Sequence, residues 1–116
     1  MSLKIIPTPQ FKRSVKQLYK RYKLLAKDLK ELEQELLKNP NAGIGISHNC
    51  FKIRLKNSSI PTGKSGGFRV IYYLKTEEKI YLLEIFSKTD MENIDENKLI
   101  SILKDNSLNW DIMILS

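Results

Sequence analysis

The sequence FKIRLK at Phe51–Lys56 is the first of three apolar runs that decide the fold. The second run is GKSGGFRVIYYL at Gly63–Leu74, and the third is KIYLLEIFSKTD at Lys79–Asp90. β-Branched and aromatic residues dominate each run, and turn-forming residues bound it. We therefore predict three successive β-strands between Cys50 and Asp90.

Cationic side chains recur within these predicted strands. Alternate residues of a strand point to opposite faces, so Lys52, Arg54 and Lys56 share one face of the first strand. Arg69 follows two glycines and a phenylalanine in the second run, and Lys88 ends the third. If the strands are neighbours, Lys52, Arg54, Arg69 and Lys88 come within reach of one another. Such a cluster forms an electrostatic site of the size of a phosphate.

The segments FKIRL, SGGFRVIYY and FSKTD occur in an order and at a spacing that resemble the RelE/ParE superfamily of bacterial type II toxin–antitoxin toxins. The resemblance is closest to the RelE-like branch, and it extends from about Thr8 to about Asp105. It implies an α+β fold in which an N-terminal helical hairpin packs on a small twisted sheet. That sheet is expected to be mainly antiparallel, with about four strands, and to be followed by a C-terminal helix. Residues 1–116 are expected to form a single toxin domain.

The resemblance implies an endoribonuclease that cuts messenger RNA in the ribosomal A site and so inhibits translation. Its chemistry needs no metal or other cofactor: the ribose 2′-hydroxyl attacks the adjacent phosphate, and the leaving 5′-oxygen is protonated. Clustered cations suit this reaction because negative charge grows on the phosphate oxygens in the transition state. Crowding of cations also lowers the pKa of a lysine, so that a lysine can act as a general base.

Carried over position by position, the resemblance implies catalytic roles for four residues. Lys52 is the expected general base, and Arg54 and Arg69 are the expected phosphate clamps. A guanidinium stays charged and therefore cannot be the base. Lys88 is expected to act as an acid or as a further clamp. Additional RNA contacts are expected from Lys56, Lys64, Tyr73 and Asp90.

Two positions depart from the pattern of the best-studied RelE toxins. Thr89 stands where those toxins have an arginine, and Asp95 stands approximately where they have a tyrosine. The leaving-group side of the mechanism is therefore unassigned, with Tyr73 and Asp90 as substitute candidates.

Two other functions stay open at this stage. A ParE-like relative would inhibit DNA gyrase by binding and would need no nuclease site. A non-catalytic module would keep only the binding of an antitoxin or a nucleic acid. Both toxin classes imply a cognate antitoxin protein, whose acidic or amphipathic segment would cover the basic face.

Length and composition limit the number of domains, the class of partner and the compartment that we expect for this protein. A chain of 116 residues suits one small domain with a core of its own. The 20 Lys and Arg residues against 13 Asp and Glu give a net charge of +7, which favours a polyanion such as nucleic acid as a partner. The single cysteine, Cys50, excludes an internal disulfide and fits a reducing compartment. With no signal-peptide pattern and no run as long as a membrane span, we expect a cytoplasmic protein.

The segment before Cys50 predicts helices. Thr8 suits an N-cap, with Pro9 at the first helical position. Apolar residues then recur at spacings of four and three: Phe11, Val15, Leu18, Tyr22, Leu25, Leu29, Leu32 and Leu36. Periodicity alone favours one continuous helix, because no Gly or Pro interrupts residues 10–38, whereas the resemblance implies two helices with a break near Tyr22–Lys27. We expect the break, because so small a domain has little to support one long rod. The first of the two helices is crowded with Lys12, Arg13, Lys16, Lys20, Arg21 and Lys23.

The residues on either side of the first core strand carry weaker signals. Gly43–Asn49 is predicted to be a glycine-rich connection in which His48, the only histidine, has a structural or exposed role. Cys50 is expected to be a small core residue. Glu84 interrupts the third strand, and a buried carboxylate needs a cation, for which Arg69 or Arg54 is the expected partner.

The end of the chain predicts one more helix. Asp95 suits its N-cap, and the helix is expected to reach about Asp105. The apolar tail Trp110–Leu115 has three open interpretations: a final strand, a self-association patch or a partner contact.

Overall fold

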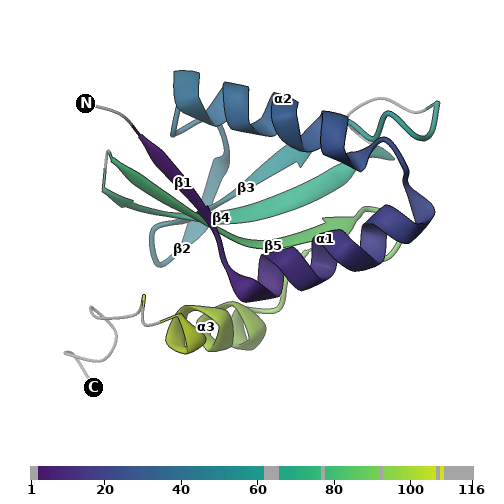
Figure 1. The fold of residues 1–116 in the computed structure, drawn as a ribbon. Coiled ribbons are helices and arrows are strands. Elements are labelled where there is room, and N and C mark those ends of the chain that lie inside the picture. Colours follow the sequence, from purple (N-terminus) through teal and green to yellow (C-terminus); the bar gives the residue numbers. More distant parts are fainter. Residues whose placement is uncertain (1–2, 62–65, 77, 92, 107, 109–116) are drawn as a thin grey trace.

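The structure is a computed structural model, and it describes residues 3–61, 66–76, 78–91, 93–106 and 108. A five-stranded sheet lies between two helical layers (Figure 1). The strands are β1 (Lys4–Pro7), β2 (Ile44–Ser47), β3 (Cys50–Leu55), β4 (Phe68–Thr76) and β5 (Lys79–Ser87). The helices α1 (Pro9–Arg21) and α2 (Leu25–Lys38) cover one face, and α3 (Glu96–Asp105) covers the other. The predicted α+β class, the helical hairpin and the C-terminal helix are confirmed.

The strand order in the sheet is β1-β5-β4-β3-β2. The pairs β2–β3, β3–β4 and β4–β5 are antiparallel, and only β1 runs parallel to its neighbour, β5. The sheet is therefore mixed but mainly antiparallel, as expected.

The sheet has five strands where the sequence predicted about four, because β2 falls in the segment interpreted as a connection. Ile44 and Ile46 of this edge strand are exposed, so no buried alternation marks it in the sequence. Between β2 and β3, His48 and Asn49 have φ of 52° and 61°, which are the left-handed values that a two-residue hairpin turn requires. His48 lies in this turn, and its Nε2 is 3.5 Å from a carboxylate oxygen of Glu96.

The predicted break between the helices is confirmed, since α1 ends at Arg21 and α2 begins at Leu25. Tyr22 adopts an extended backbone there, and the Leu24 N–H donates to the Ser59 hydroxyl at 3.0 Å. At the other end of α1, the Thr8 side chain accepts a hydrogen bond from the Phe11 N–H. This is the predicted N-cap, which satisfies one of the donors that a helix start leaves without an intrahelical partner.

Each face of the sheet has its own core. The apolar stripe of α1 and α2 packs on the side chains that β3, β4 and β5 point to one face of the sheet. Helix α3 packs on the side chains that point to the opposite face. The alternation predicted for β4 holds, because Val70 belongs to the first core and Ile71 to the second. Cys50 is buried in the second core, as expected, and burial raises the pKa of its thiol to about 12.

Some sequence predictions fall outside the described residues. These are the RNA contact assigned to Lys64 and all three interpretations of Trp110–Leu115. Within the described ranges, every helix is too short or too polar to cross a lipid bilayer.

Candidate functional site

The predicted catalytic arginines lie opposite each other on the α3 face of the sheet. Arg54 of β3 and Arg69 of β4 are Cα partners in the antiparallel register. Side chains of such partners point to the same face, and their Cα atoms are about 5 Å apart. Two positive charges are therefore held side by side by backbone pairing alone.

The two arginines differ in exposure. Arg54 is exposed, whereas Arg69 is only 2% exposed, and its Nη1 donates to the Phe68 carbonyl at 3.2 Å. Arg54 thus presents its guanidinium to solvent, and Arg69 adds positive charge from below the surface.

Lys88 joins the arginines at this end of the sheet. Leu55, Phe68 and Ser87 are aligned across β3, β4 and β5, so the residues next to them lie close together. The Lys88 N–H donates to the Gly67 carbonyl at 3.0 Å, and the lysine side chain is exposed. The structure therefore brings Lys88 to the rim on which Arg54 and Arg69 lie.

Gly67 allows the chain to approach closely at this rim. A Cβ atom at Gly67 would lie 2.1 Å from the Leu55 carbonyl oxygen, which no side chain tolerates. A glycine in a strand or beside it often marks such a close backbone approach. A residue with a side chain here would push β4 away from the end of β3.

Lys52 lies two residues before Arg54 on β3 and is half-buried. Its Nζ donates a short hydrogen bond to the Asn93 side-chain oxygen. It lines a cavity of about 310 Å³ between β2, β3 and the start of α3, into which Glu96 also projects. Lys52 is thus held at the edge of the arginine pair, next to a space that can admit a ligand.

Two of the predicted RNA contacts lie away from this cluster or are already paired. Tyr73 is four residues along β4 from Arg69, about 13 Å at the rise of a strand, and its ring packs against Tyr81. Asp90 lies near Lys88 but forms an ion pair with Arg21 of α1 at 3.1 Å. Lys56 is exposed just after the end of β3, beside the cluster.

The sequence did not indicate a role for Tyr22, which the structure places at the same rim. Its hydroxyl accepts a hydrogen bond from the Arg21 guanidinium at 2.6 Å. A hydrogen bond with Ser87 lowers the pKa of the Tyr22 phenol, and Arg21 and Thr89 act in the same direction. The only signal of Tyr22 in the sequence was its place in the apolar stripe, which concealed the hydroxyl.

The two positions that depart from the RelE pattern have local structural roles. The hydroxyls of Thr89 and Ser87 are 2.7 Å apart, which fixes the turn after β5. Asp95 is the N-cap residue of α3, without a capping hydrogen bond from its side chain. Neither side chain replaces the arginine or tyrosine whose place it takes.

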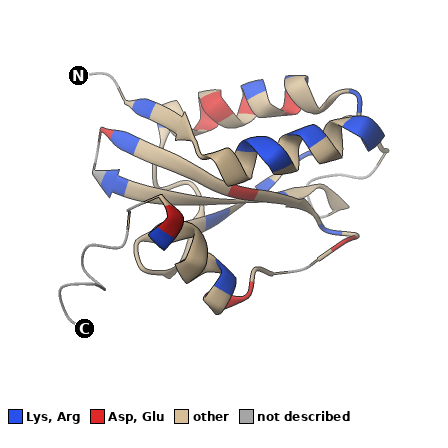
Figure 2. Cartoon of the chain, turned by 60° about the horizontal axis from the view of Figure 1, so that its bottom comes forward, with Lys and Arg blue, Asp and Glu red and all other residues tan. Residues whose placement is uncertain are grey.

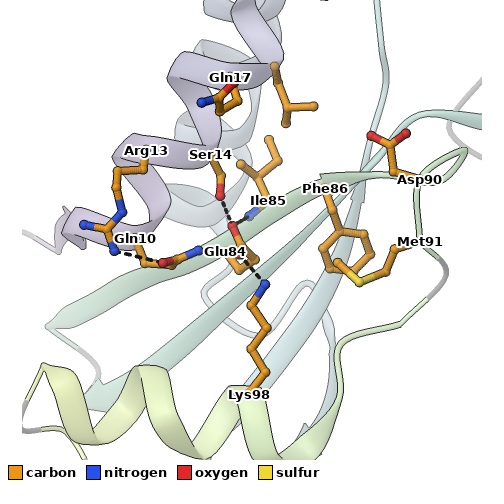
Figure 3. Close-up of a pocket in the computed structure, with 11 residues that line it drawn as sticks. Gln10, Arg13, Ser14, Gln17, Glu84, Ile85, Phe86, Asp90, Met91 and Lys98 are labelled. Atoms are coloured by element: carbon orange, nitrogen blue, oxygen red, sulfur yellow. Dashed lines mark hydrogen bonds and ion pairs between the residues drawn. The ribbon is translucent and has the colours of Figure 1, made fainter.

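Glu84 forms a second polar cluster on the outer side of β5, in a groove of about 370 Å³ between α1, β5 and α3 (Figure 3). Its carboxylate is 3% exposed, and it accepts hydrogen bonds from Gln10 at 2.8 Å and from Ser14. The cation beside it is Lys98 of α3, at 3.5 Å. The expectation of Arg69 or Arg54 was wrong, because Arg69 is paired with Phe86 rather than with Glu84, and Arg54 lies two strands away on β3.

Among the described residues, no group of three or more His, Cys, Asp and Glu side chains is placed to hold a metal ion. The arrangement at the rim offers positive charge, one lysine amine beside a cavity and one tyrosine hydroxyl. Groups of these kinds are suited to bind an anion and to transfer protons near it.

Two comparisons with known proteins agree on what this chain is similar to. A family model described as the RelE toxin of the RelE/RelB toxin–antitoxin system matches residues 3–109. A solved structure of the Escherichia coli toxin RelE, a double arginine-to-alanine mutant in the free state, is similar with a TM-score of 0.53. The match has 20% sequence identity and covers 79% of this chain and 90% of that chain, so it supports the fold.

Proposed function

The chain belongs to the RelE toxin family and is the toxin of a toxin–antitoxin system, and we propose that it acts as a ribosome-dependent endoribonuclease on messenger RNA. One observation carries the proposal: Arg54 and Arg69 are partners across β3 and β4, with Lys88 at the same rim.

Arg54 and Lys88 present exposed cationic side chains at this rim, and Arg69 lies beneath them. Clustered cations stabilise a phosphate most strongly when negative charge builds up on its oxygens in the transition state. The cluster is therefore better suited to a phosphate that gains charge during reaction than to a neutral ligand.

In the proposed mechanism, each residue has a role that its position supports. Arg54, which is exposed, grips the scissile phosphate, and Arg69 strengthens the field from beneath. Lys52, beside the cavity, takes the proton of the 2′-hydroxyl as that oxygen attacks phosphorus. Lys88 is placed to protonate the departing 5′-oxygen or to hold the phosphate with Arg54. Each assignment needs only proton transfer and charge stabilisation.

The partner that silences this toxin is proposed to be an antitoxin with an acidic or amphipathic segment. Covering Arg54 and Lys88 would block the substrate and neutralise the repelling charges at once. Hydrogen exchange with and without the antitoxin tests this proposal. Protection of β3 and of the turn after Ser87 is expected, and unchanged exchange there would contradict direct occlusion.

The test of the function is inducible expression followed by primer extension on a translated reporter. Wild type is expected to arrest growth and to cut within codons only when the reporter is translated. Lys52→Arg keeps the charge but lacks an amine that can serve as a base, so cleavage should fall by about a hundredfold or more. Lys75→Arg, on an exposed residue near the other end of β4, is the matched control and should cleave like wild type.

Other outcomes would contradict the proposal. Growth arrest with intact messenger RNA and damaged DNA would indicate a gyrase inhibitor. Harmless expression of a well-folded protein would indicate a toxin fold that only binds. Full cleavage by Lys52→Arg would exclude Lys52 as the base.

A further inference from the structure

Lys88 lies on a turn, residues 87–91, that is attached to its neighbours on two sides. The Asp90 N–H closes the turn by donating to the Ser87 carbonyl at 3.0 Å. On one side, the Lys88 N–H donates to the Gly67 carbonyl at 3.0 Å. On the other side the turn meets the end of α1. Figure 2 shows the end of α1 and the turn after β5 on the same side of the molecule, as Figure 1 does for the two elements.

Arg21 and Tyr22, at the end of α1, make the second attachment. The Arg21 guanidinium lies 3.1 Å from an Asp90 carboxylate oxygen, and it donates to the Tyr22 hydroxyl at 2.6 Å. The centre of this guanidinium is also 4.9 Å from the centre of the Tyr22 ring. The Tyr22 hydroxyl is hydrogen-bonded in turn to Ser87 and to Thr89, and the bond with Ser87 is the largest cause of the lowered pKa of the phenol. The end of α1 thus holds the turn at Ser87, Thr89 and Asp90.

The hydroxyl of Tyr22 is not needed for packing. Tyr22 is only 9% exposed, and its ring meets the Phe68 ring edge-on, with 5.4 Å between the ring centres. The ring of a phenylalanine would fill the same place. A buried hydroxyl costs free energy unless it is hydrogen-bonded, and the partners of this one are Arg21 and the side chains of the turn. The hydroxyl therefore serves the turn rather than the core.

Tyr22 acts from the face of the sheet opposite the arginine pair. Its ring belongs to the core beneath α1 and α2, as do Ile53 and Leu55 on either side of Arg54, so Arg54 points to the other face. The contacts of the Tyr22 hydroxyl lead to the candidate site through the turn, because two of its partners are the residues directly before and after Lys88.

We propose that Tyr22, held in place by Arg21, is a positioning residue for Lys88. Lysine carries its amine on a flexible four-carbon stem, so the amine is placed accurately only if the backbone beneath it is fixed. Tyr22 fixes that backbone by bonding to Ser87 and Thr89. The role of Lys88 in cleavage rests on the proposed function, whereas the fixing of the turn is tested without cleavage.

The first measurement is NMR relaxation of the backbone amides in two matched variants. Tyr22→Phe removes the hydroxyl and keeps the ring, and Tyr19→Phe makes the same change at an exposed tyrosine of α1. In Tyr22→Phe the order parameter at Lys88 should fall from about 0.85, which is typical of rigid backbone, toward about 0.6. The amides of β4 should keep their wild-type values, and Tyr19→Phe should match wild type throughout. An unchanged order parameter at Lys88 in Tyr22→Phe would overturn the proposal.

The second measurement is single-turnover cleavage of messenger RNA on ribosomes, with binding measured separately. Tyr22→Phe should cleave about tenfold or more slowly with affinity for the ribosome within about twofold of wild type, because a displacement of about 1 Å can cost about a hundredfold in rate. In a Lys88→Ala background, Tyr22→Phe should cause no further loss, since no amine is left to position. Losses that multiply, or a Lys88→Ala variant that cleaves like wild type, would overturn a role through Lys88.

The two measurements separate this inference from the proposed function. Urea unfolding first checks that both tyrosine variants fold. A wild type that does not cleave would refute the endoribonuclease, and a loss of order at Lys88 in Tyr22→Phe would still support the fixing of the turn by Tyr22. A wild type that cleaves, together with a Tyr22→Phe variant that cleaves equally fast, would refute the inference and leave the proposed function intact.

Discussion

Arg54 and Arg69 are register partners across β3 and β4, yet one guanidinium is exposed and the other is buried. Two paired backbone positions therefore place their side chains in different surroundings, solvent at Arg54 and protein at Arg69. Removing either arginine should therefore separate the demands of function from those of folding.

Arg54→Gln should abolish cleavage without loss of stability. Loss of an exposed clamp on the developing charge should lower the rate about a hundredfold or more. The free energy of unfolding should stay within about 0.5 kcal/mol of wild type, because Arg54 is exposed. Urea unfolding and primer extension measure the two quantities. A strongly destabilised Arg54→Gln would show that Arg54 supports the fold instead.

Arg69→Gln should behave differently, because this side chain is buried and donates to the Phe68 carbonyl. A loss of about 2 kcal/mol is expected when a buried charged hydrogen bond is removed. The same two assays apply, and an unchanged urea midpoint would contradict the structural role of Arg69.

Gly67→Ala should prevent β3 and β4 from meeting at the rim. The new Cβ would face the Leu55 carbonyl oxygen at 2.1 Å, and backbone must move to make room. We expect a destabilisation of about 3 kcal/mol, the upper end of overpacking costs. Gly45→Ala is the control, since its Cβ would meet only the Phe51 ring at 3.8 Å. Similar melting curves for the two variants would contradict this account.

Glu84→Gln should loosen the contact of α3 with the rest of the domain. The carboxylate accepts from Gln10 and Ser14 and faces Lys98, so a neutral amide loses charge-assisted bonds. A loss of about 2 kcal/mol is expected, with faster hydrogen exchange in α3. The exposed Glu31→Gln on α2 should stay within about 0.5 kcal/mol of wild type. Exchange in α3 that does not change would disprove the link.

Stability should fall at alkaline pH through Cys50. Burial raises the pKa of its thiol to about 12 from a usual value near 9.0. Below pH 9 both the folded and the unfolded thiol are protonated, so there is no effect. Above it only the unfolded thiol loses its proton, and stability drops by about 1.4 kcal/mol per pH unit until pH 12. Urea unfolding of wild type and Cys50→Ala at pH 8 and pH 10 should show a larger drop for wild type, and parallel curves would contradict it.

Most of the fold could be predicted because long patterns carry it. The regular spacing from Phe11 to Leu36 predicted the helical region, though not its division into two helices, and the strict alternation in β3 predicted which of its side chains share a face. The strand β2 was missed since Ile44 and Ile46 are exposed and bury no alternating set. A short edge strand depends on its neighbour rather than on its own sequence.

The sequence predicted which residues lie together at the candidate site, but not how deeply each of them is buried. The alternation of side chains along each strand correctly predicted that Arg54 and Arg69 lie on one face of the sheet. It does not show that Arg69 is buried. The partner predicted for Glu84 was wrong for a related reason: the sequence does not show which residues of β4 and β5 are paired, nor that Lys98 of α3 lies beside Glu84. The hydroxyl of Tyr22 was hidden by its apolar ring.

The parallel pairing of β1 with β5 determines when the sheet of this protein can be completed. Ile5 of β1 pairs with Ile80 of β5, so β1 cannot join the sheet until β5 has been synthesised. Contacts between such distant residues close late and slow folding. Lys88 follows the same final strand, whereas Arg54 and Arg69 are synthesised earlier. A nascent chain therefore cannot complete its sheet, or bring Lys88 to the rim, until β5 has emerged from the ribosome.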